Sequence, residues 1–391
     1  MSNKAQARNP WTDPYNDEMI SLQARLVHEV IRRLEPQVEQ VITPELAGQL
    51  EKIYLTGCGD SHYAGVAARL AFDKYSGVQT EPLESLEFSR YVVDYAPNNS
   101  LVIGISNSGQ VSRSIETLVL ARKRKLHTIA ITGYSDGPLA RAAAASLIQS
   151  VPDMAEDWGP YSMGSLGLGN FIASLLTLYL SALRIGELRG KVSSAQVAAL
   201  KRELVGAADI IARTAEADAK TARELAIAFW HLHTFYILGG GPNYATAMFG
   251  AAKLFEQPHQ NGVAQELEEW AHEQYFLTRP NVAPIFILAP PGNSRDRAME
   301  QMRGARDMGG TVVAICDAED TEVLQLAQYA LPIYGTLREE FSPLAYIVPT
   351  ELFATNLHQV KGRPPLIPPF GQEQLMQVNY RQIFHSKIWG Q

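Results

Sequence analysis

The sequence predicts an α/β fold built from two similar halves, each a parallel sheet covered by helices. Short apolar stretches alternate with longer helical segments along the chain, and parallel strands need such crossover helices. The order of strand, glycine turn and helix occurs twice, with corresponding residues 182 positions apart: Tyr54 and Tyr236, Gly59 and Gly241, Ile103 and Ile285. We therefore predict an internal duplication.

Each half contains the same series of elements. In the first half we expect strands at 53–55, 101–105 and 127–132, turns at 57–59 and 106–109, and helices at 61–71 and from the second turn to about 125. In the second half we expect strands at 235–238, 284–289 and 311–316, a turn at 239–241 and a helix at 245–256. Apolar residues between 19 and 31 recur every three or four positions, which predicts an amphipathic helix. Residues 187–230 are charged and alanine-rich, and we predict that they form connecting helices.

The composition is that of an ordinary globular protein, with 46% hydrophobic and 19% charged residues. A net charge of −7 gives no electrostatic reason to expect nucleic acid or an anionic membrane as the partner. Cys58 and Cys316 are too few for a disulfide framework or a cysteine zinc site. The N-terminus lacks the apolar core of a signal peptide, and the apolar stretch 171–183 is shorter than a membrane span. We expect a soluble cytoplasmic protein.

The strongest local motif is S-N-S-G at 106–109, between a predicted strand and a predicted helix. A helix start offers unpaired N–H groups to an anion, and ligands bind at the carboxyl ends of parallel strands. Ser106, Asn107 and Ser108 add side-chain donors, and Ser61 on the neighbouring turn adds another. The alternative is that Ser108 only caps its own helix. The corresponding second-half segment, 290–292, reads P-P-G, so we predict one anion site, in the first half.

A second group of candidates lies in the second half. Lys253 and Glu256 are three residues apart and therefore share one helix face, and His272 follows sixteen positions after Glu256. The alternatives are a solvated ion pair and a structural histidine. The sequence contains no metal-binding histidine motif, so we expect no metal. The adjacent run Asp60-Ser61-His62 lacks the context of a nucleophile and its base, and we set it aside.

Four stretches make the chain resemble the double sugar isomerase (SIS) domain proteins. It is similar to the isomerase half of glucosamine-6-phosphate synthase and to fructosamine-6-phosphate deglycases. The stretches are C-G-D-S at 58–61 for the family's C-G-T-S, S-N-S-G at 106–109 for S-Q-S-G, K-L-F-E at 253–256 for K-L-K-E, and E-W-A-H at 269–272 for E-L-K-H. The last two keep the family's spacing, and the resemblance covers roughly residues 45–360.

The resemblance implies two tandem SIS domains, each a flavodoxin-like three-layer α/β/α unit. On this basis we expect a helical extension at 1–44, a first SIS domain with the phosphate loop at 45–186, connecting helices at 187–230, a second SIS domain with the catalytic helix at 231–350, and a C-terminal tail packed near the active site at 351–391. Three positions depart from the family pattern: Gln110 and Val111 replace a glutamate and a threonine, and Glu273 replaces a glycine.

The resemblance also implies a sugar-phosphate substrate and no cofactor. The phosphate would bind Ser61, Ser106, Asn107, Ser108, Gly109 and Ser112, the last replacing the hydroxyl lost at 111. Catalytic roles fall to Glu256 for proton transfer between C1 and C2, Lys253 for charge stabilisation, His272 for ring opening or amine protonation, and Lys387 as the tail lysine that family members often supply. Since the histidine can come from a neighbouring subunit in related enzymes, we expect a homodimer.

The activities that remain open are all forms of sugar-phosphate handling. We favour a deglycase that splits a fructosamine 6-phosphate into glucose 6-phosphate and an amine or amino acid. The alternatives are an aldose–ketose isomerase, a glucosamine-6-phosphate deaminase, and a sensor that binds a phosphosugar without turnover. Because no glutaminase domain precedes the first SIS domain, we expect no glutaminase activity. Retention of Lys253, Glu256 and His272 argues against the sensor, which needs no general base.

Overall fold

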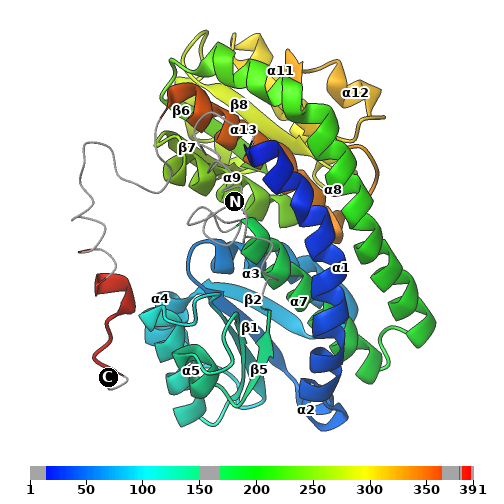
Figure 1. The fold of residues 1–391 in the computed structure, drawn as a ribbon, viewed down its shortest axis with the longest axis vertical. Coiled ribbons are helices and arrows are strands. Elements are labelled where there is room, and N and C mark those ends of the chain that lie inside the picture. Colours follow the sequence, from blue (N-terminus) through cyan, green and yellow to red (C-terminus); the bar gives the residue numbers. More distant parts are fainter. Residues whose placement is uncertain (1–14, 150–167, 363–377, 379–380, 389–391) are drawn as a thin grey trace, which may run out of the picture.

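A computed structural model describes residues 15–149, 168–362, 378 and 381–388, which form two five-stranded parallel sheets (Figure 1). The first sheet has the order β2-β1-β3-β4-β5 and consists of β1 (Lys52–Gly57), β2 (Gln79–Glu84), β3 (Ser100–Ile105), β4 (His127–Thr132) and β5 (Ala145–Ile148). The second has the order β7-β6-β8-β9-β10 and consists of β6 (Thr234–Gly239), β7 (Asn261–Glu266), β8 (Pro284–Ala289), β9 (Thr311–Cys316) and β10 (Tyr329–Ala330). Both have the flavodoxin-like strand order, which confirms the predicted fold class.

Helices cover the faces of both sheets. The first half contains α1 (Tyr15–Val41), α2 (Pro44–Gln49), α3 (Asp60–Ala71), η1 (Phe72–Ser76), α4 (Ser85–Glu87), η2 (Phe88–Val92), α5 (Ser112–Lys123), α6 (Pro138–Ala142) and α7 (Leu168–Leu188). The remaining elements are α8 (Ser194–Phe229), α9 (Pro242–Glu256), α10 (Leu267–Trp270), η4 (Gln274–Leu277), α11 (Arg295–Asp307), α12 (Thr321–Leu324), η5 (Glu339–Phe341) and α13 (Pro343–Lys361). Figure 1 shows α1 and α8 running alongside the stacked sheets.

The central strands form where the sequence predicts them, because they are apolar on both faces. Every residue of β3 and β8 is buried, as expected for strands covered by helices on each side. The duplication is confirmed at the turns, where Gly59 and Gly241 adopt the same backbone geometry, with φ of 55° and 54° and ψ of −130°. The third predicted pair of corresponding residues, Ile103 and Ile285, differs by one residue in strand register. Ile103 pairs with Leu55, whereas Ile285 pairs with Tyr236, the counterpart of Tyr54.

Three long helices, α8, α7 and α13, show what the sequence could and could not predict. The expected connecting helices include α8, which begins with a capping box formed by Ser193 and Gln196. The expectation that the apolar stretch is too short for a membrane is wrong on length. Within α7, residues Gly169–Leu188 are long and apolar enough to cross one, but 83% of that window is buried in the protein. Its apolar surface packs against α1, α3 and η1. Helix α13 continues to Lys361, past the expected start of the tail at 351.

Helix α8 carries a buried carboxyl group, Asp218, which is only 1% exposed. Among the described residues, its Oδ2 has no hydrogen-bond partner, and burial raises the pKa of Asp218 to about 8. Because folding raises this pKa, the contribution of Asp218 to the free energy of unfolding is largest below the unfolded pKa of about 4. This contribution is lost as the pH rises to the folded pKa of about 8. We expect Asp218→Asn to be more stable than the unmodified protein, with the difference growing by about 2 kcal/mol between pH 6 and pH 8.

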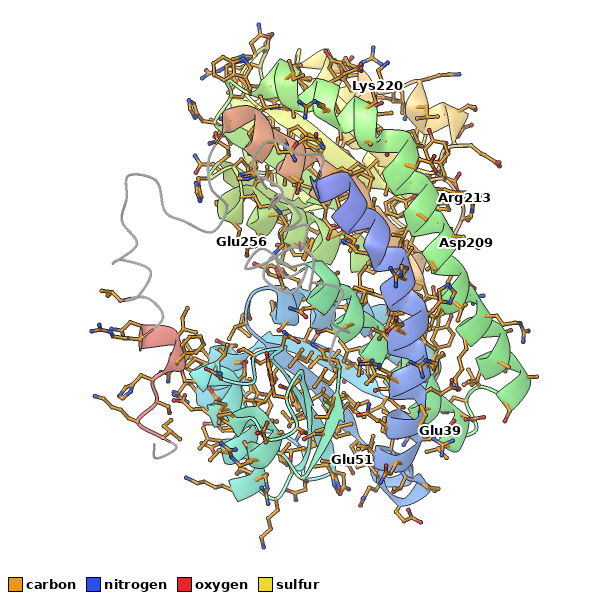
Figure 2. All side chains as sticks on the ribbon, viewed as in Figure 1. Glu39, Glu51, Asp209, Arg213, Lys220 and Glu256 are labelled. Atoms are coloured by element: carbon orange, nitrogen blue, oxygen red, sulfur yellow. The ribbon has the colours of Figure 1, made fainter. Side chains whose placement is uncertain are left out.

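Urea unfolding at the two pH values measures this difference. The matched control is Asp209→Asn, which alters an exposed carboxylate on the same helix (Figure 2). Asp209→Asn should change the free energy of unfolding by the same amount at pH 6 and at pH 8. A pH-independent effect of Asp218→Asn would contradict the assigned pKa.

Candidate active site

A cavity of about 310 Å³ lies at the carboxyl edge of the first sheet, where the two halves meet. Its wall combines the turn after β1, the loop after β3, the start of α7 and one residue of α9. The lining residues are Cys58, Gly59, Asp60, Ser61, Ser106, Asn107, Ser108, Val111, Asn170, Phe171, Ser174 and Glu256. Figure 2 shows Glu256 at the level where the upper and lower halves adjoin. The cavity therefore brings the predicted phosphate loop and the predicted general base together.

The predicted phosphate loop is held in place by backbone hydrogen bonds to β4 and its following turn. Ser106 N donates to Ile131 O at 3.0 Å, and Gly133 N donates to Asn107 O at 2.9 Å. Gly109 closes the turn with a φ of 64°, a left-handed conformation that glycine adopts without strain. Ser108 Oγ accepts a hydrogen bond from Gln110 N at 3.3 Å. This is a local contact of the kind expected from the capping alternative, and it leaves the hydroxyl proton for an acceptor.

Four of the six predicted phosphate ligands line the cavity, namely Ser61, Ser106, Asn107 and Ser108. Gly109 and Ser112 are not among the lining residues. Helix α5 begins at Ser112, three residues later than the motif suggests, and the buried Ser112 hydroxyl donates to Ile383 O of the C-terminal segment at 2.6 Å. The sequence gives no sign of this partner, because the two residues are 271 positions apart.

We expect Ser108→Ala to weaken phosphosugar binding about 10- to 100-fold with little change in kcat, because a hydrogen bond to a charged group contributes about 1.5–3 kcal/mol. Isothermal titration with a ketose 6-phosphate measures the affinity. Ser135→Ala is the control, since Ser135 is exposed beyond β4 and does not line the cavity. An unchanged affinity in Ser108→Ala would remove the loop from phosphate recognition.

A buried lysine links the two halves by contacting two carboxylates that line the cavity. Lys253 on α9 is 1% exposed, and its Nζ donates to Asp60 Oδ2 at 2.8 Å and to Glu256 Oε2 at 2.6 Å. Its Nζ also lies 4.7 Å from the centre of the Phe249 ring. The predicted shared face of Lys253 and Glu256 is confirmed. The alternative interpretation, a solvated ion pair, does not hold for Lys253, because its side chain is buried.

Burial and charge shift the pKa values of this pair. Burial alone would lower the pKa of Lys253, but the carboxylates of Asp60 and Glu256 raise it well above its usual range. Burial raises the pKa of Glu256, and Asp60 adds to the increase, while Lys253 opposes it. The site thus contains a fixed cation beside a carboxyl group of increased basicity, which suits proton transfer near neutral pH.

Asp60 is the residue that the sequence analysis missed. It takes the place of the threonine in the C-G-T-S pattern that the turn at 58–61 resembles, and the sequence suggests for it only an apparent nucleophile motif. Two features of the sequence could have indicated its role. Asp60 is a carboxylate at a helix start, and Lys253 lies in an apolar stretch that would bury it. Recognising the pair requires knowing that α3 packs against α9.

The other two predicted catalytic residues lie outside this cavity. The His272 side chain is 65% exposed, and its Nε2 lies 3.1 Å from Glu268 Oε1. Lys387 is also exposed and does not line the cavity. Within one chain, the described residues therefore place Glu256 in the lining of the cavity and Lys253 in contact with Glu256, while His272 and Lys387 lie outside it. Among the described residues, no group of three histidine, cysteine or acidic side chains is arranged to hold a metal ion.

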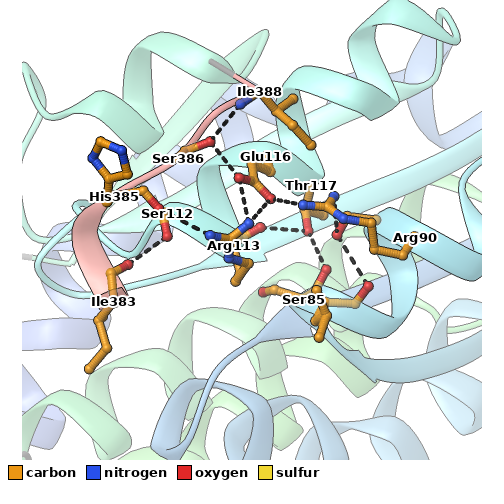
Figure 3. Close-up of polar contacts among 12 residues, drawn as sticks. Ser85, Arg90, Ser112, Arg113, Glu116, Thr117, Ile383, His385, Ser386 and Ile388 are labelled. Carbon is orange, nitrogen blue, oxygen red and sulfur yellow. Dashed lines mark hydrogen bonds and ion pairs between the residues drawn. The ribbon is translucent and has the colours of Figure 1, made fainter. Parts of the chain in front are cut away.

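The C-terminal segment 381–388 lies against α5, beside the phosphate loop (Figures 1 and 3). Arg113 Nη2 donates to His385 O at 3.0 Å, and the buried Ser386 donates its hydroxyl to Glu116. Gln382 and Ile383 line a second cavity under the segment. The predicted C-terminal tail at 351–391 includes residues 363–377, 379–380 and 389–391, which lie outside the described residues.

In the second half, a carboxylate takes the position that corresponds to the phosphate site. Glu339 Oε1 accepts a hydrogen bond from Asn293 N at 3.1 Å, and its Oε2 accepts one from Asn293 Nδ2 at 2.7 Å. This carboxylate lies against Gly292 in the loop after β8, and a Cβ on Gly292 would come within 2.4 Å of Glu339 Cδ. The arrangement favours a single anion site in the first half.

Residues 46–176 match the family model of the SIS domain. The resemblance seen in the sequence is thereby confirmed, and the second sheet repeats the strand order of the SIS domain.

Known proteins extend the similarity along the chain. It is 26% identical over 324 residues to a glutamine–fructose-6-phosphate aminotransferase (isomerizing) of Gloeobacter violaceus, covering 82% of this chain and 51% of that protein. The chain thus spans about half the length of the curated relatives it matches. The C-terminal domain of a glucosamine-fructose-6-phosphate aminotransferase from Francisella tularensis superposes with a TM-score of 0.78 at 21% identity, covering 94% of this chain and all of that one. A tagatose-6-phosphate ketose/aldose isomerase from Escherichia coli superposes with a TM-score of 0.71 at 16% identity, covering 94% and 99%. The solved structures share the fold.

Proposed function

We propose that the chain is a phosphosugar-processing enzyme that acts as a deglycase on fructosamine 6-phosphates. The observation that carries the proposal is the cavity, which combines a loop rich in hydroxyls with Glu256. The buried Lys253 donates to Glu256 and to Asp60, two carboxylates that line the cavity. The loop would bind the substrate's phosphate, and this remote binding energy would position C1 and C2 at Glu256. A sensor would not require a carboxyl group of raised pKa at this place.

The reaction follows from one proton transfer. Glu256 would take a proton from C1 and deliver it to C2. The proton of the amino group would move to O2, so that the aminoketose becomes an imine at C1 with a hydroxyl at C2. Water then adds to the imine, the C1–N bond breaks, and glucose 6-phosphate and the amine leave. The cation of Lys253 would stabilise the negative charge that develops on O2 during the transfer. His272 would act in the cavity of a second copy of the chain, where it would protonate the departing amine.

The same proton transfer would support a sugar-phosphate isomerase or an amino-sugar-phosphate deaminase. The names of similar proteins favour the isomerase as the second candidate, since they include isomerizing aminotransferases and a ketose/aldose isomerase. All these activities need the phosphate loop and Glu256. They differ in the group carried on C1.

A substrate panel tests the proposal. Fructosamine 6-phosphates, glucosamine 6-phosphate, and simple ketose phosphates are incubated with the protein, and glucose 6-phosphate, amine and ammonia are measured. The proposal predicts equal release of glucose 6-phosphate and amine from the fructosamine 6-phosphates. Interconversion of ketose and aldose phosphates without amine release would replace the deglycase by the isomerase. Binding without any turnover would leave only the sensor.

A further inference from the structure

The second cavity, under the C-terminal segment, has a volume of about 440 Å³. It is bounded by the turn after β1, the start of α5 and the docked segment. The lining residues are Cys58, Gly59, Val111, Ser112, Arg113, Gln382 and Ile383. Cys58, Gly59 and Val111 also line the candidate active site, so the two cavities share a wall.

Two polar side chains of this second cavity, those of Ser112 and Arg113, are already engaged. The Ser112 hydroxyl donates to Ile383 O at 2.6 Å, and the Arg113 guanidinium donates to Glu116 at 2.7 Å and to His385 O at 3.0 Å (Figure 3). The surface that remains is supplied mainly by the apolar parts of Val111, Ile383 and the Arg113 stem. Such a surface favours an apolar ligand group. When this group is buried there, Ser112 and Arg113 keep the hydrogen bonds that they already make.

A buried ionic network holds the segment that forms this wall. Glu116 is fully buried and paired with both Arg90 and Arg113, and the hydroxyl of Ser386 donates to the same carboxylate (Figure 3). Ser386 is 6% exposed. Two contacts therefore hold Ile383 in place. Its own carbonyl accepts a hydrogen bond from Ser112, and Ser386, three residues later, donates to Glu116.

We propose that this cavity is the subsite for an apolar substituent on the amino group of the substrate, and that Ile383 determines specificity there. The inference rests on the proposed deglycase function. With the phosphate bound at the loop and the sugar in the first cavity, the neighbouring apolar volume beyond the shared wall is available to the substituent. The preferred substrates are then fructosamine 6-phosphates of amines or amino acids with aliphatic side chains.

The test compares the glycine and leucine adducts of fructose 6-phosphate as substrates. Each buried methylene contributes about a fourfold gain, so we expect kcat/KM for the leucine adduct to exceed that for the glycine adduct by about tenfold or more. Ile383→Ala should reduce this ratio about fivefold, because it lowers kcat/KM for the leucine adduct more than for the glycine adduct. Ser386→Ala, which releases the segment from Glu116, should reduce the ratio in the same direction.

The control is Val378→Ala, which truncates an exposed aliphatic side chain of the C-terminal region outside the cavity and should leave the ratio unchanged. If the unmodified protein handles both adducts equally, or if Ile383→Ala lowers both rates by the same factor, the subsite is refuted while the deglycase function stands. If neither adduct is cleaved, the proposed function itself fails.

Discussion

Glu256→Gln should abolish turnover and leave phosphosugar binding largely intact. The amide keeps the shape of the side chain but cannot accept the C1 proton, and general-base catalysis contributes about 10²–10⁴ in rate. We therefore expect kcat to fall by at least about 100-fold, while the dissociation constant for a ketose 6-phosphate changes little. Steady-state kinetics and calorimetric titration measure the two quantities separately.

The control for this variant is Glu51→Gln, which removes an exposed carboxylate just before β1, at the opposite end of the strand from the cavity (Figure 2). Its kinetics should match those of the unmodified protein. Because burial raises the pKa of Glu256, the acidic limb of the kcat/KM profile should lie above the usual glutamate range of about 4.3. Undiminished activity in Glu256→Gln would remove this residue from the mechanism.

Lys253→Met should cost about 3–5 kcal/mol of unfolding free energy as well as activity. Removing one partner of a buried ion pair leaves the other charge uncompensated, and here two carboxylates, those of Asp60 and Glu256, lose their shared cation. Urea unfolding at pH 7 measures the loss. The double variant Asp60→Asn/Lys253→Met should recover part of it, because one of the two uncompensated charges is then removed.

Lys220→Met provides the comparison for Lys253→Met. The Lys220 side chain is 86% exposed and lies 3.6 Å from Glu224 on the surface of α8 (Figure 2). Exposed pairs of this kind contribute about 0–1 kcal/mol. A loss for Lys253→Met no larger than that of Lys220→Met would show that the buried contacts between the two halves do not stabilise the fold.

The sequence predicts the central strands well and the edge strands poorly, for a physical reason. The strands β3 and β8 are buried on both faces and are therefore continuously apolar. The strands β2 and β7 have the sequences QTEPLE and NGVAQE and are only partly buried. Their position follows from pairing with β1 and β6, which no local pattern reveals.

The site could be predicted only where its residues are close in sequence. Lys253 and Glu256 share a helix face because of their spacing, and the loop at Ser106 follows from the strand before it. Asp60 reaches Lys253 across 193 positions, and Ser112 reaches Ile383 across 271. These contacts depend on how helices and the C-terminal segment pack, so the sequence alone could not supply them.

The most direct test of the account is a crystal structure of the protein with a ketose 6-phosphate bound. The account predicts that the phosphate lies at Ser106 and Ser108, with C1 and C2 of the same molecule directed toward Glu256. A phosphate bound in the second half, or a sugar whose C1 and C2 lie away from Glu256, would contradict it.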